Sequence, residues 1–227
     1  MTGARAQILG NIARSLGRGP LPPDRVAELD RRLAAHRPNT VPVRAQLPAN
    51  EQVELFVRMA DVAAATVDRV GGTESVPAAV ARFLDDQSLL PEIIVGPADE
   101  LSAIPWAQEA GLRVRRGRAE KEGEVAVTDV FAAVAETGTL ALISGPTRHT
   151  GNAFLPETHI ALVRADQVVG PLEDVWAKLR VAGEGQDGGM MPRTVNLVTG
   201  PSRTGDIEAV MYMGAHGPRR LHIILIG

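Results

Sequence analysis

The chain has 227 residues, 24 Lys and Arg against 27 Asp and Glu, and a formal net charge of -3. A slightly acidic chain with 3% aromatic residues offers neither a basic footprint nor stacking platforms for bases, so we exclude nucleic acid as a partner. Because the sequence has no Cys, it also excludes disulfides, thiol catalysis and cysteine-held zinc or iron–sulfur centres in this chain.

The length fits one α/β domain with an accessory segment before it. No apolar run approaches the ~20 residues of a membrane span, and the first ten residues lack the apolar core of a signal peptide. We therefore expect a cytoplasmic protein without a membrane span. Residues 1–49 form an N-terminal helix and proline-rich arm, and residues 50–227 form the α/β domain.

The arm begins with an apolar stripe at helical spacing, which predicts an amphipathic helix over residues 4–16. The stripe consists of Ile8, Leu9, Ile12 and Leu16. Six prolines between residues 20 and 48 then leave room for one short helix, over 24–36. The apolar stripe needs a surface to cover it, so the arm is expected to dock on its own body or on a second subunit of a homo-oligomer.

The α/β domain begins at Asn50, a good N-cap, with a long helix that the Gly71-Gly72 pair ends. Helix and strand patterns then alternate, which favours a mostly parallel sheet with helices on both faces. The expected elements are helix 76–85, strand 92–95, helix 99–110, strands 112–115 and 124–128, the apolar stretch 131–143, paired strands 159–164 and 167–169, helix 172–180, buried strand 194–199, helix 206–213 and strand 221–226. Stretch 131–143, pivoting on Thr137-Gly138, is either a hairpin or one bulged strand.

Within this apolar stretch lies a carboxylate, Glu136, followed by Thr137, Gly138 and Thr139. Burying an unpaired carboxylate costs several kcal/mol, so Glu136 requires a cleft or a matched cation. One interpretation is a nucleophilic or basic carboxylate beside a glycine that lets a ligand approach the backbone. The alternative is an ordinary turn with a solvated Glu.

A second candidate site is the turn that follows strand 194–199. A hydroxyl-rich turn at a helix N-terminus gathers unpaired N–H groups, and open α/β folds bind ligands at the carboxyl ends of their strands. Asp206 and Glu208 offset the helix dipole here, so Arg203 must carry the charge of a bound anion. The predicted ligand contacts are Gly200, Ser202, Arg203, Thr204 and Asp206. The alternative is a purely structural helix cap.

The histidines do not have the spacing of a helical zinc site, and we expect no metal. His216, just after the last predicted helix, is the best candidate for a proton carrier near the cleft, whereas His222 in an apolar strand is interpreted as structural. Arg148, His149 and Asn152 lie in a glycine-flanked loop that either closes over a ligand or is solvated.

One short pattern occurs twice. Residues 142–148 and 197–203 share the order apolar, apolar, hydroxyl, Gly, Pro, hydroxyl, Arg. Two copies do not make a repeat fold. We interpret them as two similar strand exits that lie side by side.

Four sequence blocks together resemble the lactate utilisation protein C family (LutC/YkgG, LUD domain). They are residues 135–139, Leu155-Pro156 with His159, residues 199–208 and residues 214–218. The resemblance covers about the C-terminal half. It implies a fold like that of the NagB/RpiA/CoA-transferase superfamily. It also implies a three-component cytoplasmic system that oxidises L-lactate to pyruvate, in which the other two components carry the iron–sulfur clusters.

From this resemblance we expect a lactate-oxidation subunit with no cofactor of its own, acting with iron–sulfur partners and binding a small anionic ligand. Glu136 and His216 are the candidate catalytic groups, Glu136 only by analogy with the catalytic carboxylate of CoA transferases. Two departures from the family pattern are Gly205, where relatives often have Ala, and the loop 147–152. The alternatives are a stand-alone enzyme of the CoA-transferase or sugar-phosphate-isomerase type and a non-catalytic scaffold or regulator.

Overall fold

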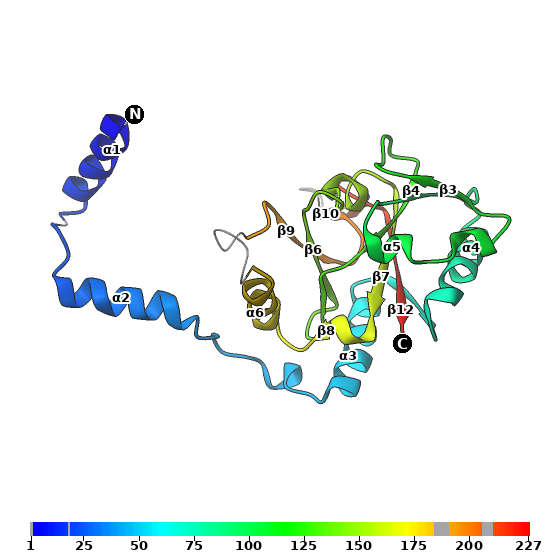
Figure 1. The fold of residues 1–227 in the computed structure, drawn as a ribbon, viewed down its shortest axis with the longest axis horizontal. Coiled ribbons are helices and arrows are strands. Elements are labelled where there is room, and N and C mark those ends of the chain that lie inside the picture. The colour runs from blue at the N-terminus through cyan, green and yellow to red at the C-terminus, as the bar shows by residue number, and fades with distance from the viewer. Residues whose placement is uncertain (1, 18, 184–190, 206–210) are drawn as a thin grey trace. The chain divides into compact units, whose positions relative to one another are not determined.

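The computed structural model describes residues 2–17, 19–183, 191–205 and 211–227, and the chain divides into two compact units, residues 1–40 and 41–227. The first unit contains the two predicted helices, α1 (Thr2–Ser15) and α2 (Pro23–Ala35) (Figure 1). Leu9 on α1 is 53% exposed, and every buried residue of the described chain lies at or after Ala45. The second unit therefore contains the whole core.

The elements of the second unit follow the predicted order for most of their length. The helices are α3 (Ala49–Val62), α4 (Val76–Asp86), α5 (Asp99–Ser102) and α6 (Leu172–Gly183). The strands are β1 (Thr66–Val70), β2 (Glu92–Val95), β3 (Arg113–Arg116), β4 (Val125–Asp129), β5 (Ala132–Val134), β6 (Thr139–Ile143), β7 (Thr158–Arg164), β8 (Val168–Val169), β9 (Val195–Thr199), β10 (Arg203–Gly205), β11 (Met211–Met213) and β12 (Arg220–Ile226).

Two sheets organise this unit. Sheet A has six strands in the order β1-β12-β7-β4-β2-β3, and all of its neighbours are parallel. Sheet B has four strands in the order β8-β5-β6-β9, with β6 antiparallel to both of its neighbours. Strands β10 and β11 form a separate antiparallel ribbon. The predicted α/β class with a mostly parallel sheet is confirmed.

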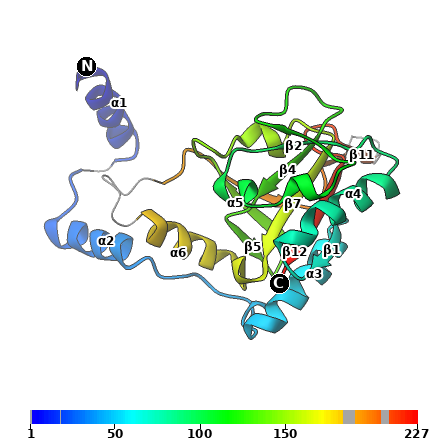
Figure 2. The same cartoon turned by 45° about the vertical axis from the view of Figure 1, so that its right-hand side comes forward.

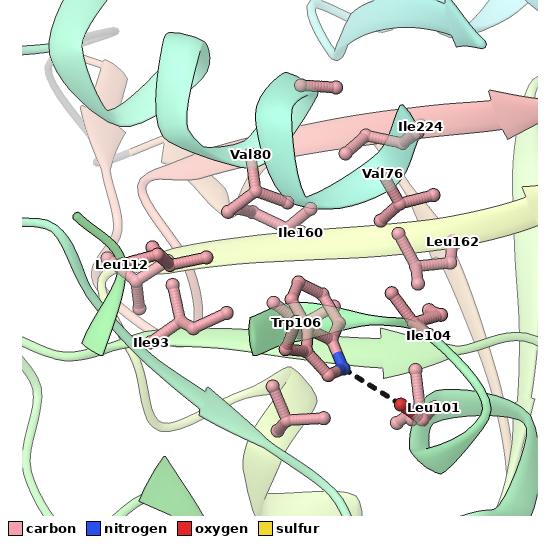
Figure 3. Close-up of a cluster of buried hydrophobic side chains, with 14 of the residues drawn as sticks. Val76, Val80, Ile93, Leu101, Ile104, Trp106, Leu112, Ile160, Leu162 and Ile224 are labelled. Atoms are coloured by element: carbon pink, nitrogen blue, oxygen red, sulfur yellow. Dashed lines mark hydrogen bonds between the residues drawn. The ribbon is translucent and has the colours of Figure 1, made fainter. Parts of the chain in front are cut away.

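Three apolar clusters hold the layers together. The first lies between α4 and sheet A, where Trp106 fills the space below α4 and donates its indole N–H to the Leu101 carbonyl at 2.9 Å (Figure 3). The second joins sheet A to α3 and sheet B, and the third joins sheet B to α6. Sheet B accordingly stands between α6 and sheet A (Figures 1 and 2).

The first long helix of this unit is shorter than predicted. It begins at Ala49 after Pro48, so Asn50 is not its N-cap, and it ends at Val62 instead of continuing to Gly71. Ala64 takes a left-handed conformation (φ 66°), which stops the helix, and the β-branched run that follows becomes β1. This strand pairs in register with β12, a partner 156 residues away that local periodicity does not reveal.

The helix predicted over 99–110 is also wrong beyond its first turn. It ends at Ser102, and only a short 3-10 turn follows at Trp106–Gln108. Pro105 explains the break, because proline lacks an N–H and clashes with the preceding helical turn.

Other differences concern strand pairing. The stretch 131–143 is a hairpin, β5 and β6, joined by the turn 135–138. Strands β7 and β8 do not pair with each other as predicted, because a 3-10 turn at Ala165–Gln167 directs β7 into sheet A and β8 into sheet B. Strand β9 is a half-buried edge strand instead of a buried one.

The helix predicted over 206–213 does not reach Met213. Met211–Met213 form β11, which pairs with Arg203–Gly205, and Tyr212 lies opposite Thr204. Asp206 and its neighbours to 210 lie outside the described residues. None of the helices in the described part of the chain is long and apolar enough to cross a membrane.

Candidate functional site

Most of the predicted site residues meet at one end of sheet B. Strands β6 and β9 are antiparallel with Thr139 opposite Thr199, so the turn that precedes β6 and the turn that follows β9 leave the sheet together. We call this group, residues 136–139, 200–204 and 214–218, the turn cluster. The structure thus brings together three of the four blocks that carry the family resemblance.

Helix α3 packs closely on this end of the sheet. Gly138 (φ 65°) and Gly200 (φ 69°) both adopt conformations that favour glycine. A Cβ on Gly138 would lie 2.4 Å from the Ala60 nitrogen, and one on Gly200 would lie 2.0 Å from the Ala63 carbonyl oxygen. The glycines therefore admit the backbone of α3, and that backbone fills the space beside Gly138.

Glu136 lies in the turn between β5 and β6. Its backbone N–H donates to the Gly170 carbonyl at 3.2 Å, and its Oε2 atom is buried with no hydrogen-bond partner among the described residues. Three hydroxyls continue from this turn across the sheet: Thr137 and Thr139 are 2.7 Å apart, as are Thr139 and Thr199. Glu136 is thus a half-buried carboxylate beside a short hydroxyl chain.

Ser202 is enclosed by the backbone of residues 214–218. Its N–H donates to the Pro218 carbonyl at 2.8 Å, its carbonyl accepts from Gly214 at 2.9 Å, and its hydroxyl accepts from the His216 N–H at 3.3 Å. His216 itself is exposed. This interlock places the backbone of His216 next to the Ser202 turn.

Arg203 provides the positive charge of the turn cluster. Its side chain is exposed, and one guanidinium nitrogen donates to the Ala63 carbonyl at the end of α3. A guanidinium has five N–H donors, so a single backbone acceptor leaves capacity for an anion. The turn is followed by strand β10 and not by a helix, so no helix N-terminus contributes positive charge here. Arg203 is therefore the positive group that these residues offer to an anion.

The two copies of the repeated pattern do not lie side by side. They leave β6 and β9, which run in opposite directions, so residues 144–148 and 200–203 emerge at opposite ends of sheet B. Arg203 belongs to the turn cluster, whereas Arg148 lies where β4 and β2 of sheet A also end.

Around Arg148 the structure forms a small cavity, which we call the Arg148 pocket. Its lining combines the ends of β2 and β4, the ends of β6 and β9 that face them, and the loop 147–154. This is the carboxyl edge of a parallel sheet, where open α/β folds bind ligands. Strand β9, to which the sequence analysis applied that rule, lies instead in the mixed sheet B.

The loop before β7 is fixed in place and is not simply solvated. Asn152 is 1% exposed, accepts from the Ala119 N–H at 2.9 Å and donates to the Gly117 carbonyl at 3.0 Å. Arg148 donates to Asp129 at 2.6 Å and to Glu100 at 2.9 Å. Burial alone would lower the pKa of Arg148, but the hydrogen bond and charge of Asp129, with the charge of Glu100, raise it.

Two buried histidines lie on opposite faces of sheet A. His159 accepts from or donates to the Thr128 hydroxyl at 2.8 Å, and Thr128 lines the Arg148 pocket. His222 shares a hydrogen bond of 2.8 Å with Thr66 and stacks on Phe83 at 4.0 Å. The second ring nitrogen of each is buried without a partner among the described residues, and burial lowers the pKa of each to about 4.

Within the described ranges, no group of three or more His, Asp or Glu side chains is arranged to hold a metal ion. Sequence reasoning singled out the loop of Arg148, His149 and Asn152, but it missed the Asp129 partner of Arg148 and the strand ends that surround this loop.

Comparison with known proteins places this arrangement in a family. The chain is 30% identical over 130 residues to lactate utilization protein C of Geobacillus kaustophilus, covering 57% of this chain and 52% of that protein. The chain thus spans about half the length of the first relatives it matches. It is 31% identical to lactate utilization protein C of Deinococcus radiodurans, covering 88% of this chain and 92% of that protein.

Escherichia coli YkgG matches at 27% identity over 98% of this chain and 97% of its own length. The fold is similar to the crystal structure of a DUF162 family protein from Deinococcus radiodurans, with a TM-score of 0.58, 23% identity, and coverage of 80% of this chain and 99% of that one. The family model of the LUD domain matches residues 53–226, from within α3 to the end of β12. The chain therefore belongs to the LUD-domain family.

Proposed function

We propose that this protein is a subunit of a cytoplasmic system that oxidises L-lactate to pyruvate together with iron–sulfur partner proteins. The observation that carries the proposal is the family match over nearly all of the second unit, combined with relatives named lactate utilization protein C, one of them aligned over 92% of its length. The chain has no Cys, so clusters ligated by cysteine would belong to the partners.

Within that role, the turn cluster is the proposed site for a small anionic ligand. Arg203 would supply the charge, with Ser202 and Thr204 as further contacts. His216 and Glu136 remain the proposed proton-carrying groups. The support is the convergence of three separated blocks at one end of sheet B and the unpartnered Glu136 oxygen.

The test of the role is reconstitution. Lactate-dependent dye reduction is measured for the purified chain, for the iron–sulfur partners and for the mixture, and only the mixture is expected to be active. Activity of the chain alone would instead indicate a stand-alone enzyme. Full activity of the partners without the chain would indicate a scaffold or regulator.

The test of the ligand site is calorimetric titration of the Arg203→Met protein with L-lactate, pyruvate and phosphate. Losing one charge-assisted hydrogen bond weakens binding by about one to two orders of magnitude, and Arg203→Lys should lose less. Arg219→Met removes a neighbouring exposed charge and serves as the control, with little expected change. Affinity that Arg203→Met leaves unchanged would place the anion elsewhere.

A further inference from the structure

The edge strands of the two larger sheets differ in how they are protected against pairing with another chain. At the edges of sheet A, three of the four residues of β3 are arginines, and β1 carries Asp68 and Arg69. At one edge of sheet B, β8 has only two residues. Charged side chains and short strands are common means of keeping sheet edges from associating. Strand β9, the other edge of sheet B, has neither.

Strand β9 lies beside β6 at the margin of sheet B (Figure 1). Its five residues, Val-Asn-Leu-Val-Thr, include no charge and no proline, and the central Leu197 is 42% exposed. Pro192 and Pro201 flank the strand and limit the segment that can extend a sheet. Strand β9 is therefore an uncharged edge of defined length.

The direction of the backbone groups of β9 follows from its pairing with β6. The Ser144 N–H donates to the Thr194 carbonyl at 3.1 Å, so the pair just before β9 is a hydrogen-bonded one. Hydrogen-bonded and non-hydrogen-bonded pairs alternate along an antiparallel ladder. The backbone groups of Val195, Leu197 and Thr199 therefore point away from β6, and no other described strand pairs with them.

The side chains of β9 alternate between two apolar layers. Val198 packs into the cluster between sheet A and sheet B, and Val195 packs into the cluster between sheet B and α6. Because side chains alternate with a period of two, Leu197 lies on the same face as Val195. Its exposed surface is thus at the open margin of the layer that α6 covers.

We propose that β9 pairs with β9 of a second copy of this chain. The two strands run antiparallel about a two-fold axis at Leu197, and they join the two four-stranded sheets into one continuous sheet. The inference goes beyond the proposed function and does not depend on it, because it concerns the edge of sheet B and uses none of the proposed ligand contacts.

A second copy is the occupant that fits because β9 is complementary to itself. An axis at Leu197 places Val195 opposite Thr199 of the second copy and Leu197 opposite its own counterpart. All three outward-pointing residues then form hydrogen-bonded pairs, each of which exchanges two backbone hydrogen bonds. An axis at Val195 or at Thr199 would pair two of the three with residues outside β9. A closed two-fold contact of this kind uses the same surface on both copies.

The charges near the strand agree with this register. It places Arg193 of one copy opposite Pro201 of the other, so no charged residue faces another of the same sign. A strongly charged strand from a different protein would find no complementary charge on β9. The pairing also brings the two exposed Leu197 side chains together, which removes apolar surface from water.

The first test measures the oligomeric state of the full chain by sedimentation equilibrium. One strand pair buries less area than a standard interface, so a dimer with a dissociation constant of about micromolar order is expected. Leu197→Lys places two ammonium groups opposite each other and should weaken the dimer tenfold or more. Leu90→Lys is the matched control, since Leu90 is 70% exposed and lies before β2, and it should leave the dimer unchanged.

The second test reads the register. Because the sequence has no Cys, one introduced Cys reports one position. Directly opposed residues of a hydrogen-bonded pair have Cα atoms about 5.5 Å apart, within the range of a disulfide. Leu197→Cys should therefore form a covalent dimer on mild oxidation. Val195→Cys should not, because the two copies of this position would lie about four residues apart along the strands, roughly 13 Å.

Mixing Val195→Cys with Thr199→Cys should restore the covalent dimer, because these two positions face each other across the axis. The cysteine variants change small parts of an edge strand and keep the test valid if Leu197→Lys fails to fold. A chain that is monomeric at millimolar concentration, unchanged dimerisation of a folded Leu197→Lys protein, or equal cross-linking of Val195→Cys and Leu197→Cys would overturn the inference. None of these results bears on lactate oxidation by the reconstituted system, so the two proposals fail separately.

Discussion

Residues 142–148, at the end of β6, and residues 197–203, at the end of β9, have the same order of residue types. Their surroundings in the structure nevertheless differ. After β9, Gly200 lies against the backbone of α3 and Arg203 donates to the end of that helix. After β6, Gly145 has open space and Arg148 joins two carboxylates at a pocket. A local sequence pattern specifies the turn, whereas the packing partner decides what the turn does.

The largest expected effect distinguishes the two glycines. Gly200→Ala should destabilise the fold by about 3 kcal/mol or more, because the new Cβ would need the space of the Ala63 carbonyl at 2.0 Å and φ is 69°. Gly145→Ala is the matched control, since its nearest atom is the Arg148 Cβ at 3.9 Å, and it should stay within about 1 kcal/mol. Urea unfolding of both proteins decides it. Equal losses would mean that α3 does not constrain the β9 exit.

A second expectation concerns pH. Because burial lowers the pKa of His159 and of His222 to about 4, the unfolded chain, with pKa values near 6.5, binds more protons between pH 6.5 and 4. Stability is then complete above about pH 6.5 and falls with acidification, by up to about 3 kcal/mol for each histidine. Urea unfolding at several pH values measures the slope.

Replacing His159 with Gln should remove about half of that slope, because one of the two buried imidazoles no longer titrates. A slope that survives in His159→Gln would show that other groups govern the acid response.

The smallest expected effect compares the two arginines of the repeated pattern. Arg148→Met leaves the Asp129 carboxylate, 10% exposed, without its partner and should cost about 2 kcal/mol. Arg203→Met removes an exposed side chain with one backbone acceptor and should cost less than about 1 kcal/mol. Thermal melts in ligand-free buffer give both values. The reverse order would indicate that Arg203, not Arg148, supports the structure.

Sequence patterns predicted the helices and strands that have a clear apolar pattern of their own. Strand β2 is a short β-branched run that is buried at three of its four positions, and α4 carries a continuous apolar face. They did not predict β1, because the segment after Ala64 becomes a strand by pairing with β12 far along the chain. Tertiary pairing there outweighs the local helical periodicity.

For the site, the sequence does not reveal what lies against the two glycines. It suggests a ligand beside Gly138 and a ligand contact at Gly200, whereas the structure has the backbone of α3 and of Ala63 against them. The Asp129–Arg148 pair could not be predicted, because its strand and its loop come together only when β4 and β6 take their places in two different sheets.

Strand β12 has a consequence for the order in which the protein folds. It lies between β1 and β7 in sheet A, although its residues, Arg220–Ile226, come later in the sequence than those of every other strand. Until these residues are available, β1 has no neighbour in the sheet and β7 exposes a free hydrogen-bonding edge. The central strands of the sheet therefore pair only after a contact of long sequence separation has formed, and such contacts form slowly. Until then, the unpaired edge of β7 can pair with strands of other chains. A chain that ends before Arg220 is therefore expected to aggregate, whether or not a ligand is present.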